Sequence, residues 1–278
     1  MRSCWPFVGA GCAWVESGVG AVVTQSFTEI AHGPNGLTGL RNGGGPADVL
    51  ANLLAADPGE AVRQVGIVDA TGRAAAHTGA RCVQAAGHVT ADGVAVQANM
   101  MERPTVWPAM LAAYEGSPGD FLDRLLAALR AAEAEGGDIR GRQSAALVVS
   151  GAPGDPPWRR EVDIHVDDHA APLDELERLI QVHRGYAALD RAEERGAAGD
   201  VAGARTAGEE ALRLAPGDGQ IMAWQAIGMA GGGAMETARA LLASATAMNP
   251  RWPEFVRRVA ASGAQPELVE PARRLLAE

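Results

Sequence analysis

Apolar and polar residues alternate in several short stretches, and this two-residue period predicts β-strands. The clearest stretch is REVDIHVDD, residues 160–168, where valine and isoleucine alternate with acidic residues and a histidine. Similar patterns predict strands over 18–26, 93–100 and 143–150, the last apolar throughout and therefore expected to be buried on both faces. Residues 63–79 predict a hairpin that turns at Ala70-Thr71-Gly72.

A period of three to four residues predicts helices between these strands. Residues 46–57 begin with Pro46, which is favoured in a first helical turn. Residues 104–135 predict two helices that are interrupted at 116–119. Because consecutive strands are joined by short turns and the helices are grouped, the pattern favours an antiparallel α+β fold over a chain of βαβ units.

From residue 184 to residue 278 the pattern is wholly helical, and this region is predicted to be a second, all-α domain. Pro216 and Pro250 lie 34 residues apart, and several alanines share that spacing. A 34-residue period of helix pairs resembles the tetratricopeptide repeat. The alternative is an irregular helical region, because alanine is so frequent that some of these coincidences carry no information.

Composition excludes several classes of protein. The 278 residues are enough for two domains, and 47% of them are hydrophobic, which is typical of globular proteins. The net charge is -10 without any basic run, which argues against nucleic-acid binding. No apolar run could span a bilayer, and the three cysteines form no C-x-x-C pair. We therefore expect a cytoplasmic protein that binds neither nucleic acid nor membranes, and the weak likeness of residues 1–20 to a signal peptide is set aside.

Two motifs could hold a phosphate or a metal, and each has a simpler explanation. The sequence GGGP at 43–46 precedes a helix but lacks the pattern of a phosphate-binding loop, so a flexible loop is favoured. Asp163, His165, Asp167 and His169 share one strand face, as metal ligands can, yet no second ligand pair accompanies them. A solvated strand face is favoured here, and we expect no metal and no cofactor.

Polar residues near the ends of two predicted strands are candidates for a binding site. Gln97 and Asn99 share one strand face, and His88 precedes that strand, an arrangement that suits oxyanion donors or substrate contacts. The alternative is that these groups satisfy backbone groups at the strand end. Thr24 and Gln25 end another strand, where a buried structural threonine is equally well explained.

Six segments together carry a resemblance to one family. They are GVGAVVTQSF (18–27), GPNGLTGLRNGG (33–44), LLAADPGEAVRQVGIVDATGRAAAHTG (53–79), AGHVTADGVAVQANMM (86–101), GGDIRGRQSAALVV (136–149) and VDIHVDDH (162–169). In this order they resemble the bacterial and archaeal DUF1028 family, over residues 3–183. The resemblance implies a domain over residues 1–183 with the four-layer αββα sandwich of the N-terminal-nucleophile hydrolases. By analogy of fold alone, it implies amide-bond hydrolysis.

Hydrolases of this class use the α-amino group and the side chain of their first residue, a Thr, Ser or Cys, as base and nucleophile. Family members usually begin with a strand like Thr-Phe-Ser-Ile-Val-Ala, which precedes the segment that matches residues 3–23. The present sequence begins within the second strand of that pattern, so we expect a truncated N-terminus, a missing first strand and an inactive chain as written. Cys4 is a poor substitute, because three residues would have to be removed to expose its amine.

The resemblance also gives the candidate residues their expected roles. Asn99 would be an oxyanion donor, while Asp138 and Arg140 would orient the substrate or the N-terminal amine. The remaining candidates would line the substrate pocket; they are Thr24, Gln25, His88, Gln97 and Ser144. The predicted function is hydrolysis of a small amide or acylated amine. The alternative is a non-enzymatic ligand-binding or scaffold protein whose helical region, 184–278, binds a peptide or protein, and self-association is left open.

Overall fold

The computed structural model describes residues 1–277. The chain divides into two compact units, one of residues 1–178 and a second that begins at Leu179. The domain boundary predicted at residue 183 lies within helix α6, Pro172–Ala197, which carries the chain from the first unit into the second. The predicted mixed α+β class, with a helical C-terminal region, is confirmed.

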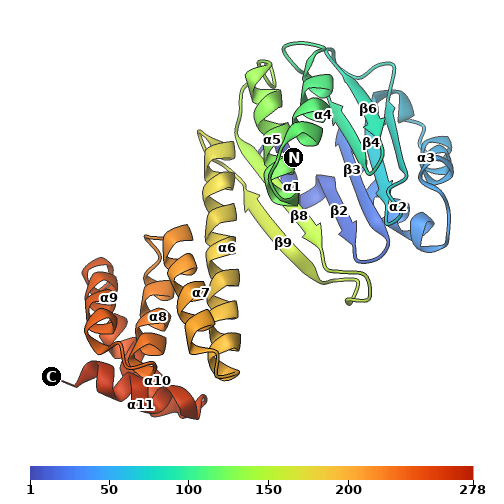
Figure 1. Ribbon diagram of the computed structural model, residues 1–278. Helices are drawn as coiled ribbons and strands as arrows, with labels where there is room; N and C mark the ends of the chain where they lie inside the picture. The colour runs from blue at the N-terminus through green and yellow to red at the C-terminus, as the bar shows by residue number, and fades with distance from the viewer. Residues whose placement is uncertain (278) are drawn as a thin grey trace. The chain divides into compact units, whose positions relative to one another are not determined.

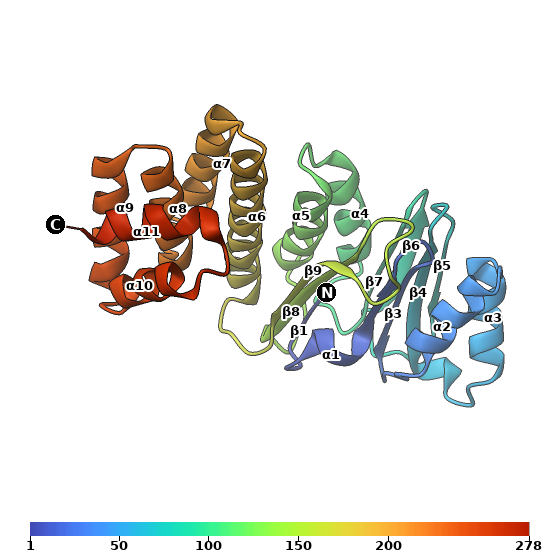
Figure 2. The ribbon, with the colours of Figure 1, turned by 90° about the horizontal axis from the view of Figure 1, so that it is seen from below.

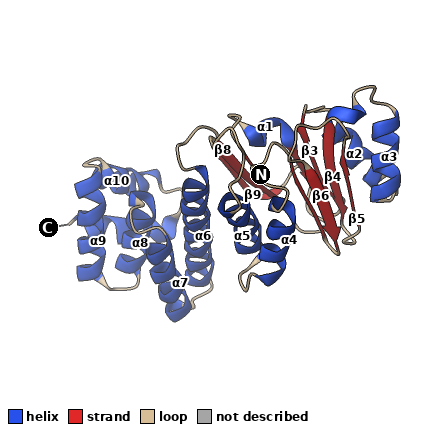
Figure 3. Ribbon diagram, turned by 90° about the horizontal axis from the view of Figure 1, so that it is seen from above, coloured by secondary structure: helices blue, strands red, loops and turns tan. Residues whose placement is uncertain are grey.

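Unit 1 contains three antiparallel sheets (Figure 3). The first has four strands in the order β2 (Ala13–Glu16), β3 (Gly20–Ser26), β4 (Arg63–Asp69) and β5 (Ala74–Thr78). The second is the hairpin of β6 (Gly87–Ala91) and β7 (Val94–Ala98). The third has the order β1 (Arg2–Ser3), β8 (Ser144–Ser150) and β9 (Arg160–Val166).

The helices of unit 1 are α1 (Val8–Cys12), α2 (His32–Arg41), α3 (Pro46–Ala55), α4 (Val106–Gly116) and α5 (Phe121–Ala134), with a short 3-10 turn at Glu60–Val62. Helices α2 and α3 cover one face of the four-stranded sheet (Figure 1). Their leucines and Val49 bury Val22, Val65 and Ile67 of the sheet.

The β6–β7 hairpin lies against the opposite face of the sheet, over β4 and β5. Helices α4 and α5 lie on the other side of the hairpin (Figure 2). Val94 and Val96 of β7 are buried with Tyr114 of α4 and Ala128 of α5. Because successive side chains of a strand point to opposite faces, Gln97 and Asn99 reach back towards β3 and β4. The hairpin is thereby held between the sheet and two helices. Assignment of this arrangement to the N-terminal-nucleophile hydrolases stays a prediction.

The sequence pattern did not predict α2, and its glycines explain why. A Cβ built on Gly33 would lie 2.0 Å from the Trp14 ring, and one on Gly36 would lie 3.0 Å from Val22. The glycines weaken the helical propensity of residues 32–41 but let the helix approach β2 and β3 closely. In contrast, Gly136 and Gly137, with φ of 101° and 64°, end α5 as glycines in the left-handed region commonly do.

Unit 2 is helical throughout its described residues. After α6 come α7 (Val201–Leu214), α8 (Gly219–Gly231), α9 (Met235–Met248), α10 (Trp252–Ser262) and α11 (Pro266–Leu276). Helices α7 and α9 begin 34 residues apart, which is the predicted period. The tetratricopeptide identity of this region stays a prediction. Within residues 1–277, no helix is long and apolar enough to cross a membrane.

Candidate functional site

Polar side chains of unit 1 gather where β3, β5 and β7 end and where β4 and β6 begin. Antiparallel pairing places Gln25 of β3 opposite Gln64 of β4, and Gln64 opposite Thr78 of β5. Directly paired residues share a face of the sheet, so these three side chains point the same way, towards the β6–β7 hairpin. They form, with His88 and Asn99, a connected set that we call the amide network.

Gln64 lies at the centre of the amide network and is completely buried. Its side-chain nitrogen donates towards the carbonyl oxygens of Gly87 and Ala98, at 3.2 and 2.9 Å, and towards the Thr78 hydroxyl at 2.9 Å. Because a carbonyl oxygen can only accept, these contacts fix which end of the Gln64 amide carries the nitrogen. The orientation of the other amides follows from it.

The Oε1 atom of Gln64 accepts from two amides that belong to other strands. Gln25 donates to it over 2.7 Å and Asn99 over 3.0 Å. Each of these amides has two N–H groups and uses one of them here, so one N–H and one carbonyl oxygen of each remain outside this contact. Both side chains are half-buried, and the shared acceptor brings their amide groups together.

The Thr78 hydroxyl extends the amide network to a titratable group. Its oxygen lies 2.8 Å from Nδ1 of His88. Nδ1 of His88 accepts the Thr78 proton in the tautomer that carries its ring proton on Nε2. Desolvation lowers the pKa of the His88 imidazole, and the neighbouring His77 lowers it further, which favours the neutral ring that can accept this proton.

Gln97 lies beside the network on β7. Its nitrogen donates to the Val23 carbonyl oxygen at 3.3 Å, while its Oε1 atom is buried without a hydrogen-bond partner within residues 1–277. That oxygen occupies the space over Gly66, where a Cβ would lie 2.2 Å from it. Glycine at position 66 is therefore what lets the hairpin sit so close to β4.

Two predicted pocket residues have backbone partners instead. The Thr24 hydroxyl donates to the carbonyl oxygen of Glu29, on the face of the sheet that α2 and α3 cover. The Ser144 hydroxyl donates to the carbonyl oxygen of Trp5. Both side chains are fully buried, so each connects its strand to a neighbouring loop. The structure does not bring either of them into the amide network.

Asp138 and Arg140 form a two-residue clamp next to Asn99. Arg140 makes a bidentate ion pair with the buried Asp138 carboxylate, at 3.0 and 2.7 Å, and its backbone N–H also donates to that carboxylate. This pairing raises the pKa of Arg140. The backbone joins the clamp to β7, because Asp138 bridges to Met101 and the N–H of Ile139 donates to Met100. The thiol of Cys4 donates to the carbonyl oxygen of Arg140 at 3.3 Å.

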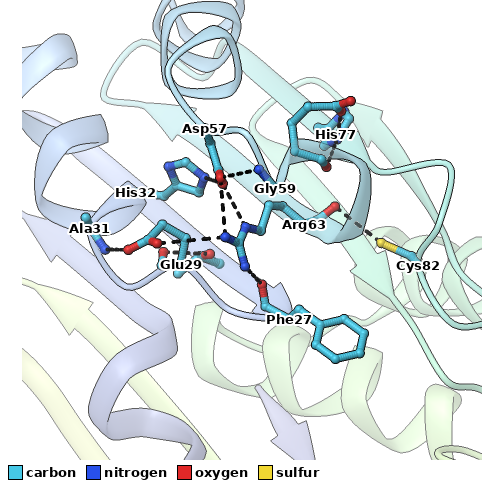
Figure 4. A network of polar contacts seen from close by, with 11 residues as sticks. Phe27, Glu29, Ala31, His32, Asp57, Gly59, Arg63, His77 and Cys82 are labelled. Atoms are coloured by element: carbon cyan, nitrogen blue, oxygen red, sulfur yellow. Dashed lines mark hydrogen bonds and ion pairs between the residues drawn. The ribbon is translucent and has the colours of Figure 1, made fainter.

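A second polar cluster lies on the opposite face of β4 (Figure 4). Arg63 holds Asp57 through two hydrogen bonds, and Nε2 of His32 lies 3.0 Å from the same carboxylate. The Arg63 hydrogen bond lowers the pKa of Asp57 to about 2, and the backbone N–H of Gly59 contributes to that shift. The cluster closes one end of a groove of about 540 Å³ between α2 and α3.

The strand face suggested as a metal site contains an ion pair. His165 lies 2.9 Å from Asp163, and Nδ1 of His169 accepts the backbone N–H of Ala171. Among residues 1–277 no group of three or more His, Cys, Asp or Glu side chains could hold a metal ion.

Sequence reasoning missed Gln64, Thr78, Asp57 and Arg63. Gln64 and Thr78 belong to the hairpin predicted over 63–79, but nothing local marks them as buried, because their partners come from β3, β6 and β7. A usable signal was the position of Gln64 directly before the apolar run of β4, where a polar side chain on the inner face requires partners.

The fold and the amide network define a two-unit α+β protein whose first unit carries a polar site at one end of its strands. Residues 1–176 match the model of a family of unknown function, DUF1028, and the chain belongs to that family. The crystal structure of protein SPO2555 from Silicibacter pomeroyi, a DUF1028 protein, is similar, with a TM-score of 0.59 and 32% sequence identity. That match covers 65% of this chain and 79% of the other. No curated protein matches the chain.

Proposed function

We propose that unit 1 hydrolyses a small amide or acylated amine at the amide network. The observation that carries the proposal is that Gln25 and Asn99, from different strands, donate to the same buried Gln64 oxygen. Two neutral amides are thereby fixed side by side at a strand end, and each has an N–H group outside that contact. Cleavage of an amide develops negative charge on its carbonyl oxygen, and N–H donors that are already in place stabilise that charge.

The side-chain amides of Gln25 and Asn99 are uncharged donors, which suits the neutral carbonyl group of an amide substrate. Asn99 would bind the developing oxyanion, and Gln25 would donate to the same oxygen or to the substrate's acyl part. The Asp138–Arg140 clamp adjoins Asn99 through Met100 and Met101, so it would orient a polar end of the substrate. Gln97 and His88 would contact the substrate from β7 and β6.

Exposed apolar side chains next to these residues favour a substrate with an apolar portion. The backbone N–H of Met100 donates to Val83, and the N–H of Ile139 donates to Met100, so Val83 and Ile139 flank the residue that follows Asn99. They are 42% and 57% exposed, respectively. An acyl chain would bury this surface, which stabilises binding by about 25 cal/mol for each Å² removed from water.

A more specific form of this proposal is the N-terminal-nucleophile reaction. In that reaction the first residue of the mature chain, a Thr, Ser or Cys, is the nucleophile. N-terminal sequencing of the native protein tests it. A mature chain that begins with one of these residues supports this form. A mature chain that begins at Met1 contradicts it and leaves the nucleophile to a side chain.

A screen of amide turnover tests the hydrolase itself. The full chain is incubated with N-acyl p-nitroanilides of different acyl length, and release of nitroaniline is followed. The sequence-based expectation of an inactive chain applies to the N-terminal-nucleophile form; with a side-chain nucleophile we expect turnover that Asn99→Leu lowers by about 100-fold, the typical loss for one oxyanion donor. Asn52→Leu, an exposed position on α3, is the matched control and should retain the activity. Binding of the anilides without turnover would instead support the alternative, a non-enzymatic ligand-binding protein.

A further inference from the structure

We propose that the Thr78 hydroxyl is the nucleophile of this site and that His88 is its general base. This inference rests on the proposed hydrolase function, and it replaces the terminal nucleophile of that function's more specific form by a side chain within the chain. The observation behind it is the hydroxyl–imidazole contact of 2.8 Å, which is the distance that a nucleophile and its base require.

The contacts around Thr78 suit proton transfer to His88. The two N–H groups of the Gln64 amide lie within hydrogen-bond distance of the Thr78 oxygen and of two backbone carbonyl oxygens. Nδ1 of His88 accepts the Thr78 proton in the tautomer that carries its ring proton on Nε2. A donor on the oxygen also stabilises the negative charge that grows there as the proton leaves, so Gln64 assists the nucleophile without touching the substrate.

The position of the pair in the fold suits the proposed reaction. Thr78 ends β5 and His88 begins β6, while Asn99 follows β7, and Gln64 lies within hydrogen-bond distance of both Thr78 and Asn99. A carbonyl carbon at the Thr78 oxygen can therefore place its oxygen towards the N–H of Asn99. Thr78 is half-buried and His88 is exposed, so the pair is open to a substrate from the His88 side.

The reaction balances with water as the only co-reactant. The Thr78 oxygen bonds to the substrate's carbonyl carbon, and the hydroxyl proton moves to Nδ1 of His88. The C–N bond then breaks, and the imidazolium gives that proton to the leaving amine. Water attacks the ester on Thr78, its proton moves to Nδ1, and cleavage of the ester bond releases the carboxylic acid as the proton returns to the Thr78 oxygen.

Covalent labelling tests this assignment. The full chain is treated with a fluorophosphonate and with a β-lactone probe, and the labelled peptide is identified by mass spectrometry. We expect the label on Thr78, its loss in Thr78→Val, its retention in Thr78→Ser, and a reduction of at least tenfold in His88→Gln. Thr90→Val, an exposed position on β6, is the matched control and should label normally.

Thermal melting shows whether Thr78→Val remains folded; if it does not, Thr78→Ser and His88→Gln decide the question. Anilide turnover together with a label on another residue, or turnover that Thr78→Val leaves unchanged, would overturn the Thr78 assignment while the hydrolase proposal stands. Neither turnover nor label in the wild-type chain would overturn both.

Discussion

Arg63 and Gln64 are consecutive residues of β4 that organise opposite faces of the same sheet. Arg63 binds Asp57 beneath α2 and α3, whereas Gln64 binds Gln25 and Asn99 beneath the β6–β7 hairpin. Because successive side chains of a strand point to opposite faces, the charged cluster around Asp57 and the neutral amide network lie on opposite faces of β4. The two can be perturbed separately, because a substitution on one face leaves the hydrogen bonds of the other in place.

The fixed orientation of the Gln64 amide predicts a large effect of a nearly isosteric change. Gln64→Glu replaces the donor nitrogen by an oxygen that faces the carbonyl oxygens of Gly87 and Ala98. We expect unfolding free energy at pH 7 to fall by about 3 kcal/mol, since buried acceptors lose their donor and a charge is buried. Urea unfolding measures this. The exposed Gln220→Glu should cost less than about 0.5 kcal/mol, and equal effects of the two would contradict the network.

The close packing of the β6–β7 hairpin against β4 depends on the lack of a side chain at Gly66. A Cβ at this position would lie 2.2 Å from Oε1 of Gln97, so Gly66→Ala must displace the hairpin or the Gln97 side chain. We expect a loss of about 1–3 kcal/mol in stability, as for overpacked cores. Gly228→Ala in α8, where no atom lies within 4 Å of the new Cβ, should be neutral or stabilising. Equal effects of the two alanine substitutions would contradict the close contact between the hairpin and the sheet at Gly66.

The Asp57 cluster predicts a component of acid sensitivity. The pKa of Asp57 is about 2 in the folded protein, below its usual value of 3.8, so its carboxylate favours folding. This contribution is complete above about pH 4 and disappears as the pH falls towards 2, and a shift of this size corresponds to about 2 kcal/mol. Urea unfolding at pH 5 and at pH 2.5 measures this contribution. Between these two pH values, the free energy of unfolding should decrease less for Asp57→Asn than for the wild type. Asp48→Asn, at an exposed position, should follow the wild type.

The Asp138–Arg140 clamp should show energetic coupling. Arg140→Met leaves the Asp138 carboxylate, which is 3% exposed, with only a backbone donor. We expect this variant to lose about 2 kcal/mol and Asp138→Asn to recover part of that loss in the double variant. Arg142→Met, which breaks a more exposed pair with Glu133, should cost less than about 1 kcal/mol. If the losses in unfolding free energy of the two single variants added up to that of the double variant, the ion pair would contribute nothing to stability.

The lowered pKa of His88 predicts the pH dependence of catalysis. The base must be neutral, so kcat/KM should rise with pH and level off, with a midpoint below the usual histidine value of 6.5. His77→Gln removes the electrostatic interaction with His77 that lowers the pKa of His88 and should move that midpoint upward, whereas His183→Gln, in the second unit, should not move it. A midpoint above 7 in the wild type would contradict a neutral His88 as the base.

Much of unit 1 could be predicted from local pattern. Alternation marked β3, β4, β5, β7 and β9, and apolar periodicity marked α3, α4 and α5, because each of these elements buries one regular face, whereas β8 was marked by its continuous apolar run. Helix α2 was missed because it is built from glycines that pack against Trp14 and Val22, contacts that only the folded chain brings together.

The site was predictable only in part for the same reason. Gln97 and Asn99 were recognised because they alternate with apolar residues on one strand. Gln64 was not recognised, since its importance comes from residues 39, 14, 23 and 34 positions away in the chain. Asp138 and Arg140 were expected to face a substrate, and their mutual ion pair could be suggested, but not established, by their spacing.

Cleavage of an amide through an acylated side chain of the amide network is tested most directly by intact-mass spectrometry. The full chain is mixed with an N-acyl p-nitroanilide and quenched in acid within the first turnover. We expect a mass increase equal to one acyl group, formed together with one equivalent of nitroaniline and absent in Thr78→Val. An unchanged mass with no nitroaniline released across the range of acyl lengths would contradict it.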